Sequence, residues 1–383
     1  MREVVIVEGC RSAVARRNGA LANTRPDELL ADVLNDLMER SEVAKEAVED
    51  VIIGCVTQIN EQAMNVARTA ALLAGFPTDV PGVTLDRQCG SSQQAVHFAT
   101  QAILAGDMNV IVAGGVESMS RSPLLANVGS VKPSERLTKK YNIVHQGVAA
   151  ELIAEKWGFS RKRLDEYALK SHERACKAIE LGYYEEEIVP IVIEDETGKK
   201  FAFAKDEGPR SDTTLAKLSE LSPVFKKGGS ITAGNASQMS DGASALLLME
   251  KDTAATYGLK PRAKIVARDV IGSDPTLMLT GPIAATKRVL QRANLTVYDI
   301  DRFEVNEAFA PVPLAWMEEI GVDDARLNVN GGAIALGHPL GATGTRILVS
   351  LLNELERIDG TYGLIATCEG MGMANATVIE RIT

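Results

Sequence analysis

Two stretches of this chain repeat the same order of predicted elements, and this repeat constrains the fold more than any other feature of the sequence. The first stretch runs from Glu3 to about Ser118, and the second from Pro261 to about Gly370. Each reads as strand, helix, strand, helix, strand with short connections, which predicts an α/β fold of parallel strands covered by helices. The repeat is one of pattern and not of residue identity.

A more charged and less regular stretch, at about 119–230, separates the two copies and predicts an insert that lies over the functional site. A chain of 383 residues is also longer than one simple hydrophobic core supports. We therefore expect an N-terminal domain over residues 1–250, which includes the insert, and a C-terminal domain over residues 260–383. The segment 251–261 is the best candidate for the linker.

Charge and cysteine content exclude several classes of protein. The formal net charge of −10 argues against broad binding of nucleic acid or anionic membranes, although a local basic patch could still hold an anionic small molecule. No apolar run approaches the ~18 residues of a membrane span, and the N-terminal sequence lacks a signal-peptide pattern. The five cysteines are widely spaced without a CxxC, so neither a disulfide framework nor a zinc site is expected. A reducing, cytoplasmic compartment is the resulting expectation.

The stretch RQCGSS places Cys89 in a turn between a predicted strand and a predicted helix. Apolar residues recur with helical spacing from Ala95 to Ile103, and Gly106 predicts the end of that helix. A helix N-terminus favours an anion and lowers the pKa of a cysteine, so this turn suits a reactive thiolate. The alternative is a small buried hydrophobe in a tight turn.

Two more glycine-rich turns carry residues suited to the same chemistry. His338 lies in GGAIALGHPLGATG, at the corresponding turn of the second copy, and Cys368 lies in ATCEGMGMAN, directly after a predicted buried strand. Because ligands of open α/β sheets collect at the carboxyl ends of strands, we expect these turns to meet that of Cys89. A histidine with a near-neutral pKa can remove a thiol proton or donate to an oxyanion. The alternatives are a hydrogen-bonded loop histidine and a packed core thiol.

Four further polar residues have two interpretations each. Asn306 in EVNEAFA is either a helix N-cap or a polar group that holds a water, and Glu307 either orients its neighbours or favours a first helical turn. Ser237 in GNASQMSDG is either a turn residue or a donor to a ligand. Arg210 in EGPRSDTTLAKL is either a solvated charge or a phosphate contact, and the pattern alone favours the solvated charge.

Two cysteines and one histidine at three glycine-rich turns indicate acyl transfer through a thioester. One thiol would be the nucleophile, the histidine would activate it, and the second thiol would handle a different proton. A redox-sensing Cys89 is a competing interpretation, and it predicts oxidation but no acyl adduct.

The chain resembles the thiolases, the acyl-CoA C-acyltransferases, over essentially its whole length. The motifs RQCGSS, GGVESMSRSP, GNASQMSDGA, NEAFA, GGAIALGHPLGATG and CEGMG occur in the order of that family. The resemblance implies a thiolase fold, with two similar βαβαβαββ halves in a five-layer αβαβα sandwich and an inserted loop domain over the active site. It also implies a homo-oligomer, either a dimer or a homotetramer. Thiolases use no metal or prosthetic group, and coenzyme A is a substrate.

The resemblance also implies roles for individual catalytic residues. Cys89 is similar to the nucleophile that takes the acyl group, and Cys368 to the acid/base that protonates the leaving enolate of acetyl-CoA. His338 resembles the activator of Cys89 and an oxyanion-hole donor. Asn306 resembles the residue that holds the water completing that hole, and the backbone N–H groups of Cys89 and Gly370 resemble a second hole.

For the substrates, the resemblance implies that Ser237 and Arg210 contact CoA and that His145 lines the pocket. The expected reaction is thiolytic cleavage of a 3-oxoacyl-CoA by CoA to acetyl-CoA and a shortened acyl-CoA, with Claisen condensation as its reverse. Such chemistry belongs to fatty acid metabolism and β-oxidation.

Departures from the family's motifs leave the substrate open. They occur at Asp86, Gln146, Gln238, Ser240 and Ala374. The QCGSSQQA and CVTQINEQ stretches look more like those of degradative thiolases with bulky substrates than like those of acetoacetyl-CoA-specific acetyl-CoA C-acetyltransferases, which are the alternative. A related carrier-protein condensing enzyme is not expected to carry Cys368, and a non-catalytic acyl-CoA or lipid carrier should have lost one of the reactive residues.

Overall fold

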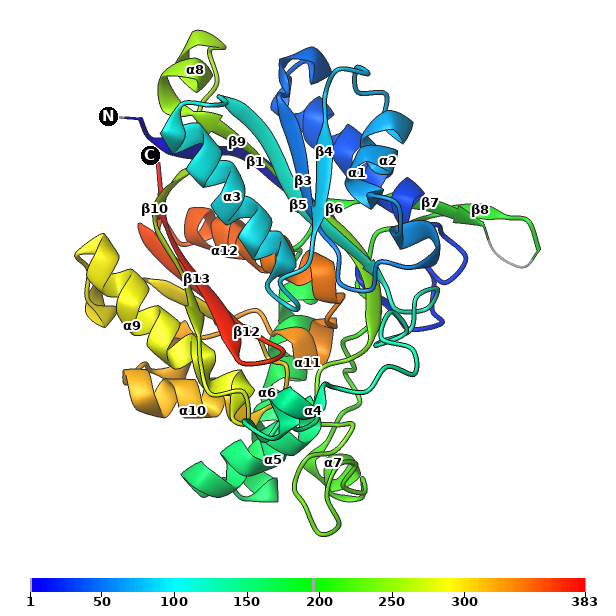
Figure 1. The fold of residues 1–383 in the computed structure, drawn as a ribbon, viewed down its shortest axis with the longest axis vertical. Coiled ribbons are helices and arrows are strands. Elements are labelled where there is room, and N and C mark those ends of the chain that lie inside the picture. Colours follow the sequence, from blue (N-terminus) through cyan, green and yellow to red (C-terminus); the bar gives the residue numbers. More distant parts are fainter. Residues whose placement is uncertain (1, 195–196, 383) are drawn as a thin grey trace.

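The computed structural model describes residues 2–194 and 197–382, and most of its strands join one large sheet (Figure 1). The main strands are β1 (Val4–Ser12), β3 (Asp50–Gly54), β4 (Gly82–Leu85), β5 (Val110–Ser118), β9 (Ser240–Glu250), β10 (Ala263–Gly272), β11 (Arg302–Val305), β12 (Tyr362–Glu369) and β13 (Met373–Arg381). Hydrogen bonds order them as β11-β12-β13-β10-β1-β9-β5-β3-β4. Short strands β2 (Ala15–Arg16) and β6 (Ile188–Val189) pair with β9 and β1, and β7 (Ile191–Glu194) with β8 (Lys200–Phe203) forms a separate hairpin.

The sheet is mixed, so the expectation of parallel strands is only partly correct. β3 runs parallel to β4 and β5, and β11 runs parallel to β12. β9 returns from the insert and lies antiparallel between β1 and β5. β13 follows β12 after a turn of three residues, and so short a connection permits only antiparallel pairing. The repeated pattern of elements did not predict the antiparallel pairing of β9 and β13.

The helices complete five layers, as the resemblance implied. α1 (Pro26–Ser41) and α2 (Val66–Leu73) pack on β1, β3, β4, β5 and β9 from one side, and α3 (Ser91–Ala105) and α12 (Thr343–Arg357) pack together on the other (Figure 1). α12 also contacts β11 and β12 of the second half. α9 (Gly281–Ala293) covers β10, β12 and β13 from outside, with α10 (Pro311–Ile320) beside it. Separate apolar clusters fill the spaces between these layers.

Local sequence explains where these helices begin and end. Pro26 occupies the first turn of α1, where its missing N–H costs nothing. α3 ends at Gly106, whose φ of 88° is the left-handed C-cap that glycine adopts most easily. α12 buries the apolar positions that the sequence predicted, namely Ile347, Leu348, Leu351, Leu352 and Leu355.

The insert supplies α4 (Glu135–Thr138), α5 (Gln146–Trp157), α6 (Arg161–Glu180) and α7 (Leu215–Ser219), which gather at one end of the molecule (Figure 1). Buried residues of α5 and α6, such as Ile153 and Leu164, share an apolar cluster with Phe303 of β11 and Trp316 of α10. α6 also packs on the short helix α11 (Ala333–Leu336), which precedes His338. The remaining helix, α8 (Lys251–Thr256), lies within the segment predicted as the linker.

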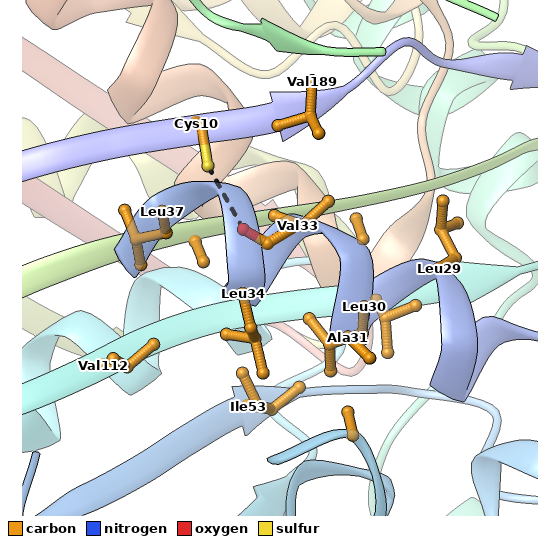
Figure 2. Close-up of a cluster of buried hydrophobic side chains, with 14 of the residues drawn as sticks. Cys10, Leu29, Leu30, Ala31, Val33, Leu34, Leu37, Ile53, Val112 and Val189 are labelled. Atoms are coloured by element: carbon orange, nitrogen blue, oxygen red, sulfur yellow. Dashed lines mark hydrogen bonds between the residues drawn. The ribbon is translucent and has the colours of Figure 1, made fainter. Parts of the chain in front are cut away.

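Cys10 shows what a structural thiol looks like in this protein. It is fully buried on β1, against α1, and its Sγ donates to the carbonyl oxygen of Val33 at 3.5 Å (Figure 2). Leu34 and Leu37 of α1 belong to the same apolar cluster. Burial raises the pKa of the Cys10 thiol well above its usual range, so this residue is inert packing.

Candidate active site

Cys89 lies in the turn between β4 and α3, as predicted. Gln88 before it has a φ of +49°, a strained conformation for a residue other than glycine, and no side chain caps α3 at Gly90. Cys89 is 4 % exposed and forms a small apolar cluster with Val56, Met119 and Leu340. A group attached to this sulfur would therefore meet apolar side chains from three different loops.

The Cys89 thiol is not acidified in the free protein, which contradicts the expectation from its place at a helix N-terminus. Burial, followed by the nearby Glu369 carboxyl, raises the pKa of Cys89 to about 12. The backbone N–H of Cys89 acts in the opposite direction but does not outweigh the loss of solvent. The thiol is therefore protonated at neutral pH and needs a base to become a nucleophile.

His338 is brought to the same place by the second glycine-rich turn. The N–H of Thr345 in α12 donates to Ser92 Oγ in α3 at 3.0 Å, which joins the first turns of the two helices. Leu340, two residues after His338, touches the Cys89 cluster. No hydrogen bond joins Cys89 to His338 in the described part of the chain, so proton transfer needs the closer approach that substrate binding brings.

Hydrogen bonds determine which nitrogen of His338 carries the proton. The Thr343 hydroxyl donates to the carbonyl oxygen of Pro339 at 2.8 Å, so it must accept from Nδ1–H of His338, 2.6 Å away. This leaves a lone pair on Nε2. Burial, and to a lesser extent Arg346, lowers the pKa of His338 to about 3, not near neutrality as predicted, so the ring is neutral. A neutral imidazole with an unprotonated Nε2 is the form that accepts a thiol proton.

Replacing Thr343 by valine tests this tautomer assignment. Thr343→Val keeps the side-chain shape but removes the acceptor of Nδ1–H, so the proton should shift toward Nε2. We expect iodoacetamide to alkylate Cys89 at least about 10-fold more slowly, by analogy with the loss of the hydrogen-bond partner that orients a metal-bound histidine. Thr343→Ser retains the hydroxyl and should alkylate like the wild type. Equal rates for all three proteins would contradict the assignment.

Asn306 is not a helix N-cap, and its amide lies beside His338. α10 begins five residues later, at Pro311, and its N-cap is Ala310. The Nδ2 of Asn306 lies 3.3 Å from Nε2 of His338, and its Oδ1 is buried with no hydrogen-bond partner among the described residues. An unused buried acceptor beside the histidine indicates that a further donor binds here.

Glu307, next to Asn306, orients its neighbours and lies outside any helical turn. Its buried carboxylate accepts from Tyr167 and Ser171 of α6, at 3.0 and 2.7 Å. It also accepts from Nδ2 of Asn328 at 3.2 Å and from the N–H of Ile334 at 3.1 Å. This carboxylate therefore ties the insert to the segment that leads to His338.

Cys368 is the second-last residue of β12, so it lies within the strand and not directly after it as predicted, and its sulfur lies near that of Cys89. It is fully buried, and burial, followed by the Cys89 sulfur, raises the pKa of Cys368 well above its usual range. Gly370 follows in the tight turn to β13, and a Cβ on Gly370 would lie 2.9 Å from Gln88 Oε1 and 3.1 Å from Gln146 Nε2. The two thiol-bearing turns and the start of α5 thus surround one small space, and a side chain on Gly370 would require the amide groups of Gln88 and Gln146 to move.

The three predicted substrate-binding residues lie around this centre. His145 is exposed, caps α5, and stacks on Phe225 at a ring distance of 5.1 Å, and Phe225 in turn meets the edge of Phe309. Ser237 is half-buried, and its N–H donates to the carbonyl of Ala308 in the NEAFA motif.

Arg210 is exposed. Its backbone N–H donates to Nδ1 of His172 at 3.2 Å, and its carbonyl oxygen accepts from the N–H of Thr213 at 3.3 Å. Gln238, next to Ser237, links the loop of Ser237 to the loop of Arg210. The Gln238 side-chain amide donates to the carbonyl of Gly208, and also to those of Ile334 and Ala335. Ser237 and Arg210 therefore lie on adjoining loops, with the Arg210 side chain open to solvent.

Three residues that the motifs contain, but to which the sequence assigned no role, complete the site. Thr343 fixes the histidine tautomer, and Glu369 is a buried carboxyl next to Cys368. Glu117 accepts from the N–H groups of Val56, Thr57 and Gly341, which holds the Cys89 pocket against the His338 loop. The sequence signal for Glu117 and Glu369 was an acidic residue at the end of an apolar strand. A carboxyl group is rarely buried unless it has a partner, so its presence there indicates a specific role.

Comparisons with known proteins show which proteins this chain is similar to. The family model for the thiolase N-terminal domain matches residues 4–252, and that for the thiolase C-terminal domain matches residues 259–381. The steroid 3-ketoacyl-CoA thiolase FadA6 of Mycobacterium tuberculosis is 48% identical over 100% of this chain and 95% of that protein. A beta-ketoadipyl-CoA thiolase of Acinetobacter baylyi is 42% identical over the full length of both. A crystal structure of the Bacillus anthracis acetyl-CoA acetyltransferase superposes with a TM-score of 0.93 at 41% identity, covering 100% of this chain and 99% of that one.

Proposed function

This chain belongs to the thiolase family and is an acyltransferase that cleaves 3-oxoacyl-CoA by thiolysis, and we propose that Cys89 carries the acyl group between the two half-reactions. The observation that carries this proposal is the meeting of three buried reactive side chains, Cys89, His338 and Cys368, at one point where two glycine-rich turns and a strand end converge. A neutral His338 supplies the base that the Cys89 thiol requires, because its Nε2 carries no proton and accepts only a 3.3 Å hydrogen bond from the Asn306 amide among the described residues.

In the first half-reaction, the Cys89 thiol gives its proton to Nε2 of His338, and the thiolate attacks the 3-oxo carbon. The protonated His338 then donates to the new oxyanion, together with a water held by Asn306. The bond between carbons 2 and 3 breaks as the carbonyl re-forms. Acetyl-CoA leaves as its enolate and takes the Cys368 proton, so the site now holds an acyl thioester, an imidazolium and a Cys368 thiolate.

In the second half-reaction, the Cys368 thiolate removes the proton of an incoming CoA thiol. The CoA thiolate attacks the thioester on Cys89, and the backbone N–H groups of Cys89 and Gly370 stabilise the tetrahedral oxyanion. Cys89 leaves as a thiolate and recovers its proton from His338. Every proton returns to its starting position, and the two half-reactions need only CoA and its thioesters, without a metal or prosthetic group.

For the substrate, we propose a degradative thiolase that acts on acyl groups larger than that of acetoacetyl-CoA. Relatives named for steroid and β-ketoadipyl substrates support this proposal, whereas the acetyl-CoA acetyltransferase neighbour supports the alternative. His145 and the Phe225 ring would border the acyl side, and Ser237 and Arg210 would contact CoA. The pathway would be β-oxidation or a related acyl-CoA degradation.

A substrate comparison tests this proposal directly. We expect the CoA-dependent kcat/KM to be higher for a long or branched 3-oxoacyl-CoA than for acetoacetyl-CoA, because the pocket would be built for the larger group. A preference for acetoacetyl-CoA would identify an acetyl-CoA C-acetyltransferase. Failure to cleave either substrate would contradict thiolysis and favour a non-catalytic acyl-CoA carrier.

A homo-oligomer is also proposed, with a dimer as its unit and a tetramer as the larger form. β4 is the last strand of the sheet, and Val83 on it is 44% exposed. The flanking helices add exposed Leu72 and Leu73 from α2 and Phe98 from α3. An uncovered strand edge with apolar neighbours suits antiparallel pairing with a second copy. The molar mass from light scattering should be at least twice that of the chain.

A reducing, cytoplasmic location fits the chemistry. The cysteines are free thiols, and the mechanism needs two of them reduced. Among the helices that the structure describes, none is long and apolar enough to cross a membrane.

A further inference from the structure

Glu369 is a buried carboxyl group placed between the two thiol-bearing turns. It follows Cys368 at the end of β12 and has no exposed surface. Its Oε1 lies against Gly90, since a Cβ placed on Gly90 would be only 1.9 Å away. Glu369 therefore fills the space between the strand end that carries Cys368 and the first residue after Cys89.

The surroundings of Glu369 do not stabilise a negative charge. The Asn375 amide on β13, in the orientation that satisfies both of its ends, donates to Oε1 at 3.0 Å and accepts from the N–H of Gln94 at 3.3 Å. Oε2 is buried and has no hydrogen-bond partner among the residues described. Arg87 and Asp86 are the charged neighbours, and in the described part of the chain neither is bonded to Glu369. A carboxylate buried with one unsatisfied oxygen and no bound cation is costly, so the group keeps its proton.

We propose that Glu369 is a positioning residue that works as the uncharged acid: it spaces the two thiol-bearing turns without placing a second negative charge beside their sulfur atoms. The proposal rests on the roles assigned to Cys89 and Cys368. It identifies a group that determines how readily those thiols ionise, beyond the residues that contact substrate.

The electrostatics of the site agree with this placement. Burial raises the pKa of Glu369 to about 9, Arg87 lowers it and Asp86 raises it. After burial, the Glu369 charge is the largest cause that raises the pKa of Cys89, and it also acts on Cys368. Below about pH 9 this charge is absent, and above it the charge opposes formation of either thiolate.

The pH dependence of Cys89 alkylation by iodoacetamide tests the proposal in the full-length protein. In the wild type, we expect the rise of the rate with pH to flatten above about pH 9, where Glu369 ionises. Glu369→Gln keeps the shape and the Oε1 acceptor but cannot ionise, so the rate should continue to rise and be about threefold or more higher at pH 10. Asp86→Asn removes an exposed negative charge from the same neighbourhood and should retain the break.

Two outcomes would overturn the proposal. One is a break near pH 9 that persists in Glu369→Gln, and the other is a break that only Asp86→Asn abolishes. A second measurement covers a variant that folds poorly: in the wild type, the infrared carbonyl band of protonated carboxylic acids should lose intensity as pH rises through about 9, and a band that is unchanged over this range would refute the uncharged state. Neither readout requires turnover, so loss of thiolysis would leave this inference testable on its own.

If Glu369 is protonated in the folded protein, the stability of the protein should fall as pH rises toward the pKa of Glu369. Because the pKa of Glu369 is raised from 4.5 to about 9, folding retains a proton that the unfolded chain loses, and this contribution to stability falls as pH rises between those values. The Tm of Glu369→Gln should therefore decline less between about pH 7 and pH 9 than the Tm of the wild type. Parallel declines would count against the proposal.

Discussion

Replacement of Cys89 by alanine is expected to reduce CoA-dependent thiolysis by about 10⁴-fold or more, because no other group can carry the acyl chain between the two half-reactions. The sulfur lies in a small cluster of four residues, so its loss should leave the fold intact. The measurement is kcat/KM with a 3-oxoacyl-CoA, alongside circular dichroism to confirm folding.

Cys10→Ala is the matched control for this loss. Cys10 is also buried and has a thiol of raised pKa, but it packs in the core against α1. Its replacement should retain thiolysis, with any loss confined to stability. Comparable loss of activity in both variants would show that Cys89 acts through packing and not as the nucleophile.

Replacement of Cys368 by alanine should separate the two halves of the reaction. Cleavage of the carbon–carbon bond releases an enolate, a strong base that needs an acid, and we expect its rate to fall about 10³-fold. Transfer of an acyl group from a simple acyl-CoA to Cys89 releases a thiolate, which is stable with a pKa of about 8.5 and needs no acid. That transfer should stay within about tenfold of the wild-type rate.

Single-turnover measurements can follow both rates in the same variant. Acetylation of Cys89 by acetyl-CoA is read by intact mass, and thiolysis by loss of the 3-oxoacyl-CoA. If Cys368→Ala slows both reactions equally, the second thiol only supports the structure of the site. If thiolysis proceeds normally, the assignment of Cys368 as the acid is wrong.

The sequence predicted the elements of this fold well because their signals are local. Apolar spacing located α3 and α12, and Gly106 marked the end of α3. The positions of β9 and β13 were not predictable in the same way, because each depends on pairing with strands distant in the chain or on a hairpin return. The assumption of parallel strands failed at these two places.

The catalytic residues were predictable, whereas their protonation states were not. Cys89, His338 and Cys368 stand in motifs that can be read from the chain. The pKa of Cys89 was expected to be low from the helix N-terminus alone, but burial and Glu369 reverse its direction. Likewise, the tautomer of His338 depends on a hydroxyl five residues away and on the carbonyl of Pro339.

Asn306 illustrates the limit of a short motif. Asn before Glu-Ala-Phe is a common helix start, yet the helix begins later, and the amide lies 3.3 Å from Nε2 of His338. Only the approach of β11 to the His338 loop decides between these interpretations, and that approach is a property of the assembled sheet. Glu117 was missed for the same reason, because its hydrogen-bond donors come from two segments far apart in the chain, at residues 56–62 and at Gly341.

The most direct test of the central claim is to locate the covalent intermediate. Wild-type protein is mixed with a 3-oxoacyl-CoA in the absence of added CoA, quenched in acid and digested. The peptide masses are then measured by mass spectrometry. We expect one acyl group, on the peptide that contains Cys89, which disappears when CoA is added and never forms in Cys89→Ala. An acyl group on a different cysteine, or turnover without any adduct on Cys89, would contradict it.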